Sequence, residues 1–199
     1  TFADGASAST GATVTGLVNG TSYTFRVSAT NSVGTGATYT SGSVTPSTTP
    51  SAPSISSITA SNASLSVAFT AGADGGSALT SYKYSTDGGT TFRTRAAGTT
   101  GSPLVISTLS TNGSTTLTNG TAYTFTVTST NAIGTSVSSA PSTAYTPAAG
   151  PIAPTSVTAV RGDQRATVSW SGALGNGAPI TGYTVTSNPG AFQCQTIGS

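Results

Sequence analysis

Histidine, glutamate and methionine are absent from this 199-residue sequence, and only 5% of its residues are charged. Its acidic residues are four aspartates in or beside predicted turns or a chain end: Asp4, Asp74, Asp87 and Asp163. Without histidine, Ser/His/Asp triads, Cys/His pairs and most zinc sites lack their central residue. Scattered aspartates also make a poor carboxylate pair for glycoside hydrolysis. The sequence therefore predicts that the chain is not an enzyme and uses no metal or cofactor.

Other features are equally scarce. The six basic residues are spread along the chain and form no dense stripe of the kind that binds a phosphate backbone, so we expect no nucleic-acid partner. No apolar run approaches the roughly eighteen residues that a membrane helix needs, so we expect no membrane span. Low charge is also typical of disorder, but disordered segments have few β-branched and aromatic residues. Here Thr, Val, Ile and Tyr recur in strand-like patterns, which favours a folded β-protein.

One phrase occurs twice. Residues 19–37 read NGTSYTFRVSATNSVGTGA and residues 119–137 read NGTAYTFTVTSTNAIGTSV, identical at eleven of nineteen positions. Apolar and polar residues alternate in both copies, which predicts a half-buried strand. Each copy begins with an Asn-Gly pair and ends in Asn and Gly, so turns are expected on both sides of the strand. Two copies 100 residues apart predict a tandem β-repeat.

The repeat divides the chain into three parts. Residues 53–147 are predicted to be a complete domain of about seven short strands, spaced as in a two-sheet sandwich. Residues 1–46 correspond to the C-terminal half of such a domain, with three strands, and residues 154–199 to the N-terminal half of a further one. The strands expected in the complete domain are SISSITA, LSVAFTAG, LTSYKYS, TFRTR, PLVIST, STTLTNG, the repeated phrase and SSAPSTAYTP. The linkers TPSTTPSAP and TPAAGPIAP favour extended, semi-rigid joints.

The order and spacing of these features resemble fibronectin type III domains, especially the Thr- and Gly-rich tandem versions in secreted or cell-surface bacterial proteins. The resemblance rests on an aromatic residue in the second strand, on ITGYTV in the third, and on TGLVNGTSYTFRVSATNSVG. It implies an all-β, immunoglobulin-like fold of β-sandwiches in tandem. It also implies core aromatics and tyrosine corners, in which a Tyr hydroxyl bonds to the chain upstream. The expected core aromatics are Phe69, Tyr82, Trp170 and Tyr183, and the expected corners are Leu17 with Tyr23 and Leu117 with Tyr123.

Cys194 is the only cysteine. In the bacterial repeats that the chain resembles, a cysteine at this place often pairs with one just before the TVTGL strand. That slot is Ala12 in residues 1–46, and for residues 154–199 it would lie beyond Ser199. The resemblance thus implies a disulfide partner outside the 199 residues, which suits an extracellular compartment. A buried, inert thiol is the alternative.

Three short motifs have structural as well as functional explanations. Residues 85–92, STDGGTTF, are similar to the Asp-box of sialidase-type propellers, and Asp-Gly between strands is independently a hairpin signal; a sugar or cation contact is the alternative. Arg161-Gly162-Asp163 spells the integrin-binding tripeptide, but it lies between the first two strands of its domain and we interpret it as a turn. Glycosylation sequons, which Thr/Ser/Asn-rich chains produce by chance, begin at Asn19, Asn62, Asn112 and Asn119.

In repeat phase the sequence stops almost where it starts, so residues 1–46 and 154–199 are expected to be complementary halves of one sandwich. A half-sandwich exposes an inner face and strand edges. We therefore expect adjacent copies of the repeat, in one long chain or between molecules, to complete it. The predicted function is a spacer, stalk or fibre in an extracellular, secreted or cell-surface filament protein.

Two alternatives to this structural function are open. The first is a cell-adhesion module that binds a glycan or surface receptor, which predicts exposed aromatic residues clustered at one loop end. The second is an accessory region of a secreted glycosidase.

Overall fold

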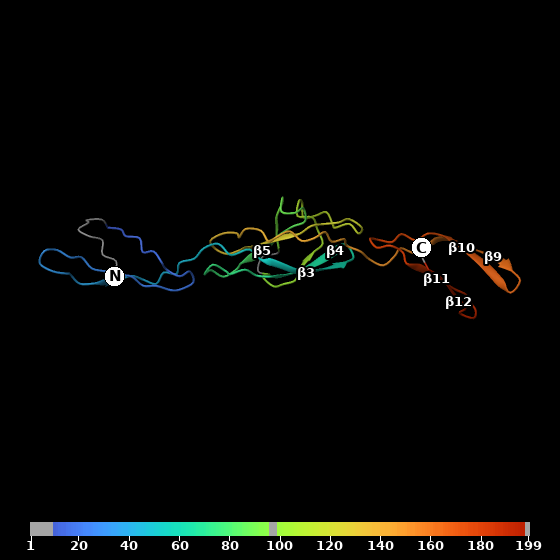
Figure 1. The fold of residues 1–199 in the computed structure, drawn as a ribbon, viewed down its shortest axis with the longest axis horizontal. Coiled ribbons are helices and arrows are strands. Elements are labelled where there is room, and N and C mark those ends of the chain that lie inside the picture. Colours follow the sequence, from blue (N-terminus) through green and yellow to red (C-terminus); the bar gives the residue numbers. More distant parts are fainter. Residues whose placement is uncertain (1–9, 96–98, 198–199) are drawn as a thin grey trace.

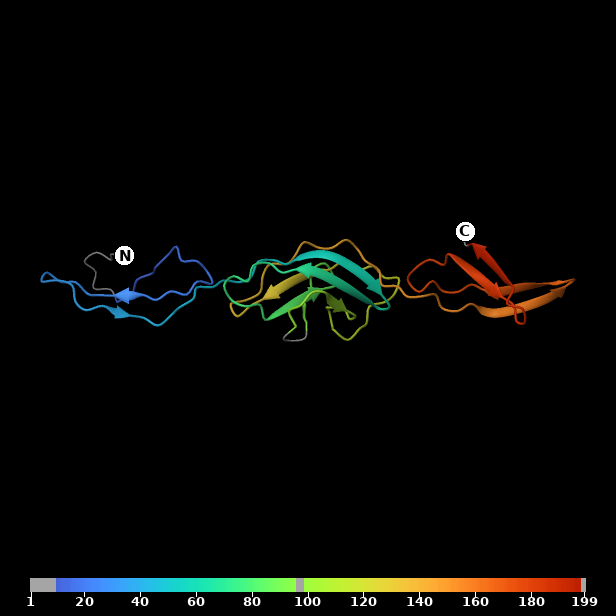
Figure 2. The ribbon, with the colours of Figure 1, turned by 90° about the horizontal axis from the view of Figure 1, so that it is seen from below.

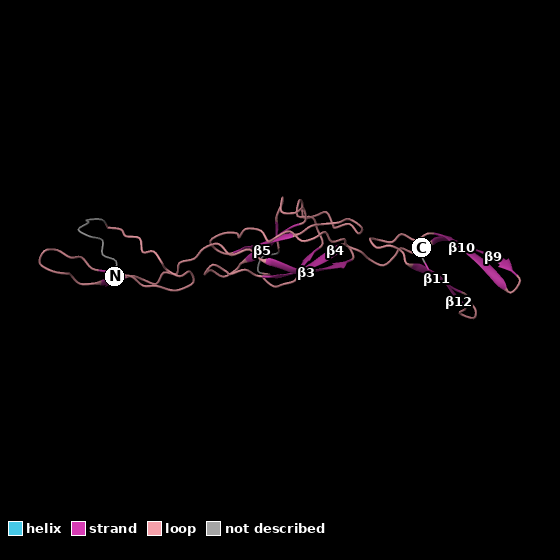
Figure 3. Cartoon of the chain, viewed as in Figure 1, coloured by secondary structure: helices cyan, strands magenta, loops and turns pink. Residues whose placement is uncertain are grey.

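The chain is elongated and built from strands. The computed structural model describes residues 10–95 and 99–197, and in these residues it has twelve strands and no helix. Three parts lie in a row in both views: the N-terminal segment (residues 10–46), the middle sandwich (residues 54–147) and the C-terminal segment (residues 154–197) (Figures 1 and 2). Extended loops make up much of each part (Figure 3). Within the described residues, no helix has the length and hydropathy of a transmembrane segment.

The middle sandwich consists of two antiparallel sheets. One sheet has the order β3 (Ser54–Ser61), β4 (Ser64–Thr70), β7 (Leu104–Ile106). The other has the order β6 (Arg93–Thr94), β5 (Ser81–Ser85), β8 (Thr126–Thr130). The first two strands and the fifth thus share a sheet, while the third, fourth and sixth form the facing one, as in immunoglobulin-like sandwiches. The predicted all-β, immunoglobulin-like fold is confirmed.

The core of this sandwich follows from period-two alternation. In β4, Leu65, Val67 and Phe69 are buried, while the residues between them face the other side. The ring of Phe69 packs against Tyr82 of β5 with centroids 4.5 Å apart and planes tilted by 59°, a favoured aromatic geometry. The buried hydrophobic core comprises Leu65, Val67, Phe69, Tyr82, Tyr84, Leu104, Ile106, Leu117, Phe125 and Val127.

The last predicted strand of the middle sandwich, SSAPSTAYTP, is not a regular strand. Residues 136–145, which we call the serine edge, begin at the end of the repeated phrase and continue through this segment. Every third residue of the serine edge contacts the strand of the repeated phrase. The N–H groups of Ser136, Ser139, Ser142 and Tyr145 donate to the carbonyls of Ser129, Val127, Phe125 and Tyr123 at 2.8–2.9 Å. In return, the N–H groups of Ser129, Val127 and Phe125 donate to the hydroxyls of Ser136, Ser139 and Ser142 at 3.0–3.1 Å.

This pattern corrects the strand prediction for a physical reason. A three-residue period turns backbone carbonyls away from the neighbouring strand, so serine hydroxyls accept the hydrogen bonds that carbonyls accept in a regular ladder. Pro141 has no N–H to donate, and proline is found on sheet edges for that reason. Two other predicted strands are also shorter than expected: TFRTR contributes only Arg93–Thr94, and STTLTNG contributes a single bridge from Thr116 to Thr108.

The flanking segments each contain a part of this architecture. In the N-terminal segment, β1 (Arg26–Val27) pairs with β2 (Tyr39–Thr40). The sequence predicts three strands here, and the first of them, TFADGASASTG at residues 1–11, lies almost entirely outside the described residues. In the C-terminal segment, β9 (Thr155–Gly162) pairs with β10 (Arg165–Ser171), and β11 (Gly182–Thr186) with β12 (Gln193–Ile197). The rings of Trp170 and Tyr183 pack against each other with centroids 5.3 Å apart and planes tilted by 55°, in the manner of Phe69 and Tyr82.

Candidate functional site: the joints between the sandwiches

Two joints connect the three parts, and the same backbone hydrogen bonds recur in both. In each joint, the glycine of the Asn-Gly turn donates its N–H to a linker proline carbonyl, and two linker N–H groups donate to the loop after the second strand of the following part. In the first joint these bonds run from Gly20 to Pro46, Thr48 to Gly75 and Ser51 to Ala73, each 2.9 Å. In the second they run from Gly120 to Pro147, Ala149 to Asn176 and Ile152 to Leu174, each 3.0 Å.

These bonds hold the linkers more firmly than their composition predicts. Proline content alone favours an extended but unattached linker. Here the linker backbone is paired with the domain that follows it, so its direction is set by tertiary contacts. Pro50 and Pro53 of the first linker are also buried. The linkers are therefore held extended by backbone pairing as well as by their proline content.

Glycines allow the turns on either side of each joint to touch. Gly177 has a φ of +96°, and a Cβ added there would lie 2.5 Å from the Pro147 carbonyl oxygen and 2.8 Å from the Gly120 nitrogen. Gly76, with a φ of +83°, occupies the matching position in the first joint, where an added Cβ would overlap the Gly20 nitrogen. No L side chain fits either place without moving backbone.

The side-chain amide of Asn119 connects three turns by hydrogen bonds at the second joint. The Nδ2 of Asn119 donates to the Oδ1 atoms of Asn62 and Asn176, both at 2.8 Å. The Oδ1 of Asn119 accepts the N–H of Ala63, also at 2.8 Å. Asn176 in turn donates to the carbonyl of Gly150 at 3.0 Å. The hydrogen bonds of Asn119 therefore connect the middle sandwich to the C-terminal segment.

Asn131 has a comparable role on the linker side of the first joint. Its Nδ2 donates to the carbonyls of Thr48 and Asp74, both at 2.8 Å. Its Oδ1 accepts the N–H groups of Ile133 and Gly134, which shapes the loop that carries it. The side chain is buried with its hydrogen bonds satisfied, a state that favours a single loop conformation.

Sequence reasoning missed these joint residues. It used the repeated phrase to locate a strand, whereas Asn119, Gly120 and Asn131 lie in the turns at the ends of that phrase. The available signal was identity: Asn19, Gly20 and Asn31 occupy the same places in the first copy. No local pattern links Asn119 to Asn62 or Asn176, because each lies 57 residues away in the chain.

The expected tyrosine corners have matching hydrogen bonds. The hydroxyls of Tyr23 and Tyr123 accept the N–H groups of Val18 and Thr118, each at 3.0 Å and five residues upstream. Tyr123 is half-buried, and Leu117 is fully buried beneath the turn. In the N-terminal segment Tyr23 and Leu17 are both half-buried. Each hydroxyl therefore spans the turn that enters the repeated strand.

The Asp-box-like residues form the turn between β5 and β6. The carboxylate of Asp87 accepts hydrogen bonds from the N–H of Thr91 at 3.0 Å and from its hydroxyl at 2.6 Å, and another from the hydroxyl of Ser85. Burial raises the pKa of Asp87, but the hydrogen bonds from Ser85 and Thr91 outweigh it and lower that pKa from 3.8 to about 2. These contacts explain the motif as a turn. The described residues contain no group of three or more His, Cys, Asp or Glu side chains placed to hold a metal ion.

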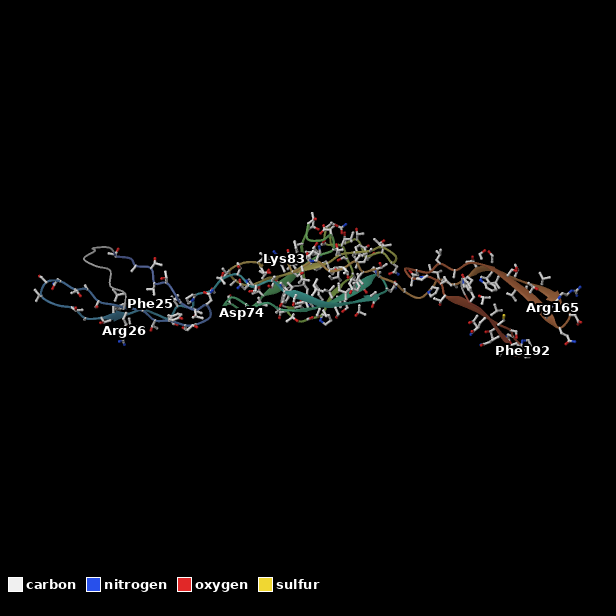
Figure 4. The ribbon with its side chains drawn as sticks, in the orientation of Figure 1. Phe25, Arg26, Asp74, Lys83, Arg165 and Phe192 are labelled. Carbon is white, nitrogen blue, oxygen red and sulfur yellow. The ribbon has the colours of Figure 1, made fainter. Side chains whose placement is uncertain are left out.

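The Arg161-Gly162-Asp163 tripeptide lies at the tip of the β9–β10 hairpin, next to Arg165 at the far end of the molecule (Figure 4). The corresponding turn of the middle sandwich, Asn62-Ala63, packs against Asn119 in the second joint. Both turns place a residue at positive φ, Ala63 at +48° and Gln164 at +50°. The tripeptide thus occupies the position of a joint turn, in keeping with its interpretation as a turn.

The sequons and Cys194 lie in different surroundings. Asn119 uses its amide nitrogen in the joint, and Asn112 donates to the Thr115 hydroxyl within its own turn at 2.7 Å. The Oδ1 of Asn62 accepts from Asn119, whereas Asn19 is exposed. A glycan on Asn119 would therefore replace one of the two N–H donors that it uses in the joint. Cys194 is an exposed, free thiol on β12, opposite Val185, so its disulfide stays a prediction.

These features together define a tandem array of immunoglobulin-like β-sandwiches with repeated joints. No protein-family model and no curated protein matches the chain.

Among solved structures, the chain is similar to a crystal structure of titin domains, with 20% identity and a TM-score of 0.37 over 55% of this chain and 36% of that one. It is also similar to the FN1–FN3 domains of chicken CNTN1, with 18% identity and a TM-score of 0.41 over 91% of this chain and 63% of that one. The chain thus spans less than two thirds of either relative.

Proposed function

We propose that this chain is a structural repeat segment of an extracellular surface or filament-forming protein, acting as a spacer, stalk or fibre. The observation that carries the proposal is the repetition of the joint. Both joints use the same three backbone hydrogen bonds and the same glycine-to-glycine contact. Repeating a joint repeats the relation between neighbouring sandwiches, which produces an extended array.

The chemistry of the joints favours stiffness over flexibility. A flexible tether needs linkers without tertiary contacts. In this chain the linkers are paired with the following part, and Asn119 and Asn131 make further side-chain bonds across them. Such a function requires no reactive side chain and no cofactor. The extracellular location is part of the proposal, and it rests on the resemblance to secreted and cell-surface bacterial repeats.

The placement of aromatic residues favours this function over glycan or receptor binding. An adhesion site of the expected kind gathers exposed aromatic side chains at one loop end. Tyr39 and Phe192 are 79% and 78% exposed, but they lie in different flanking segments (Figure 4 labels Phe192). Tyr145 is half-buried and lines an open groove beside β3.

Solution X-ray scattering on the full chain and two glycine variants tests the proposal. At dilute concentration we expect the maximum dimension of a rod. Gly177→Ala should reduce the maximum dimension or broaden the distribution of interatomic distances, because the added Cβ would clash with backbone atoms across the second joint. Gly16→Ala is the matched control: Gly16 also has positive φ, +79°, but an added Cβ there meets nothing within 4 Å.

A compact or freely jointed wild-type chain would overturn the proposal. An identical response of the two glycine variants would also contradict it, since the joint contact would then have no effect on shape.

A further inference from the structure

A groove of about 450 Å³ runs along one side of the middle sandwich, between the edge strands β6 and β7. Two arginines line it: Arg93 in β6 and Arg95 immediately after this strand. Arg93 lies opposite Tyr84, which is buried in the core, and cross-strand neighbours share a face of a sheet. Residues two apart on a strand also share a face, so both arginines extend from the edge of one sheet towards the edge of the other.

Each guanidinium group is placed by a contact with a loop next to β7. The Arg93 guanidinium lies against Gly113, where an added Cβ would overlap it. The Arg95 guanidinium donates to the carbonyl of Gly101. Neither contact is with an anion, and within the described residues Arg93 donates no side-chain hydrogen bond. Most of the N–H donors of the two groups are therefore available to a ligand.

No ion pair joins either arginine to a carboxylate among the described residues. The middle sandwich has two aspartates, and both are used elsewhere. Asp87 accepts hydrogen bonds from Ser85 and Thr91 within its own turn. Asp74 accepts the N–H of Gly76 beside the first joint, at 2.9 Å. The positive charge of the groove is therefore unbalanced by the protein, which suits an anionic ligand.

The C-terminal segment shows that the fold does not require arginines at these two places. Its strands β11 and β12 pair in the register of β5 and β6, with Cys194 and Thr196 where the middle sandwich has Arg93 and Arg95. Charged side chains on an edge strand can also prevent pairing with other chains, but β12 carries none. The two arginines are therefore a property of the middle sandwich and not of the repeat.

We propose that this groove binds the acidic groups of a polysaccharide, with Arg93 and Arg95 as the binding residues. Carboxylate and sulfate groups both match the planar fork of a guanidinium, which binds them through two parallel hydrogen bonds. Residues two apart on a strand are separated by about 6.6 Å along it, so each arginine can bind a separate acidic group of one sugar chain. The site goes beyond the proposed function and does not depend on it, because it attaches the side of the molecule to an acidic polymer.

The other lining residues favour a sugar chain over a nucleic acid. Most of them carry hydroxyl groups, which suit a ligand with hydroxyls on every ring: Thr94, Thr99, Ser107 and Thr108. The only aromatic residue of the lining is Tyr84, which is buried with its hydroxyl bonded to Thr108, so bases have no ring to stack on. Two arginines are also far fewer cations than a phosphate backbone needs.

Fluorescence anisotropy of labelled oligosaccharides with the full chain is the first test. The probes are an oligogalacturonate, which carries carboxylates, an oligomer of dextran sulfate, and neutral dextran. The wild type should bind one or both acidic probes and not dextran, with an affinity that falls as salt is added. The stronger of the two acidic probes identifies the group that is recognised. Failure to bind either, or equal binding of dextran, would overturn the proposal.

Three charge-removing variants locate the site. Arg93→Gln and Arg95→Gln should each weaken binding of the acidic probe by about tenfold, the loss expected for hydrogen bonds to a charged group. Lys83→Gln is the matched control (Figure 4 labels Lys83). It removes the same charge from the neighbouring strand, but Lys83 lies opposite Thr94, on the other face of the sheet. Its affinity should change by less than about twofold. Equal losses in all three variants would show attraction by net charge alone and would overturn the site.

Two further variants keep every charge and test the geometry. Gly113→Ala should displace the Arg93 guanidinium and weaken binding several-fold, whereas Gly101→Ala should not, because an added Cβ there meets nothing within 4 Å. Arg93→Lys leaves the backbone unchanged and removes the planar fork, so it should also weaken binding. Thermal unfolding of each variant checks that the sandwich is folded. Wild-type affinity in both Gly113→Ala and Arg93→Lys would contradict the assigned position of Arg93.

The outcomes separate this site from the proposed function. Binding of polyglutamate or of an oligodeoxythymidylate as tight as that of the acidic sugars would overturn the assignment to a polysaccharide. A rod in the scattering experiment would leave the spacer function standing whichever probe binds. A flexible chain that still binds an acidic sugar through Arg93 and Arg95 would remove the spacer function and leave the groove.

Discussion

The two copies of the repeated phrase differ in burial far more than in sequence. Phe125 and Val127 are fully buried in the middle sandwich, while Phe25 is half-buried and Val27 largely exposed in the N-terminal segment. The regular strand is five residues long in the second copy and two in the first. The second copy pairs with β5 and faces the β3–β4–β7 sheet, and the first has neither neighbour among the described residues. Alternation makes a segment amphipathic, and a facing sheet is needed to bury it.

Removing the same phenylalanine from each copy should have the largest effect. Phe125→Ala leaves a cavity in the only complete core of the described residues and should lower the free energy of unfolding by about 3–5 kcal/mol. Phe25→Ala should lower it by less than about 1 kcal/mol in dilute solution, because that side chain already contacts solvent. Urea unfolding followed by circular dichroism measures both. Equal losses would mean that the two copies are buried alike.

The serine edge provides the next comparison. Ser139→Ala removes the acceptor for the buried N–H of Val127 and should cost about 1–3 kcal/mol of stability. Ser138→Ala, at the exposed neighbouring position, should change stability by less than about 0.5 kcal/mol. Thermal unfolding distinguishes them, and a neutral Ser139→Ala would show that the hydroxyl does not replace a ladder carbonyl.

Removing the tyrosine hydroxyls should lower the free energy of unfolding by a smaller amount. The loss should again be larger in the middle sandwich than in the N-terminal segment. Tyr123→Phe removes one hydrogen bond from the N–H of Thr118, and the expected loss is about 1 kcal/mol because that bond lies near solvent. Tyr23→Phe removes the equivalent bond in the segment with the less buried core, so its effect should be smaller. An unchanged melting temperature for Tyr123→Phe would argue against a stabilising tyrosine corner.

Acid should weaken the middle sandwich through Asp87. Because its pKa falls from 3.8 to about 2 on folding, the stabilisation is fully present above pH 3.8 and is lost as the pH falls towards 2. Melting temperatures measured between pH 5 and 2 should therefore decline less steeply in Asp87→Asn than in the wild type. Asp163→Asn changes an exposed turn, and its melting temperature should decline with pH as in the wild type. If its decline were as shallow as that of Asp87→Asn, the loss of stability would be a general effect of acid and not due to Asp87.

Local pattern accounts for much of the fold and little of the joint. The sequence predicted a strand at LSVAFTAG and a hairpin turn at Asp87-Gly88, and the structure has β4 and the turn between β5 and β6 at these places. For SSAPSTAYTP the sequence predicts an ordinary strand, because the alternation typical of strands has a period of two and does not describe a contact at every third residue. The bonds of Asn119 were not predictable in this way, since they join turns from separate parts of the chain.

The sequence by itself determined that the chain is built from strands, that its pattern repeats, and which face of each strand is apolar. These properties depend on neighbouring residues along the chain, through side-chain alternation and turn preferences. The tertiary structure alone decided how serine hydroxyls replace carbonyls at the edge, and how glycines and asparagines set one sandwich on the next. Those outcomes depend on contacts between residues far apart in the chain, which geometry brings together and local sequence does not specify.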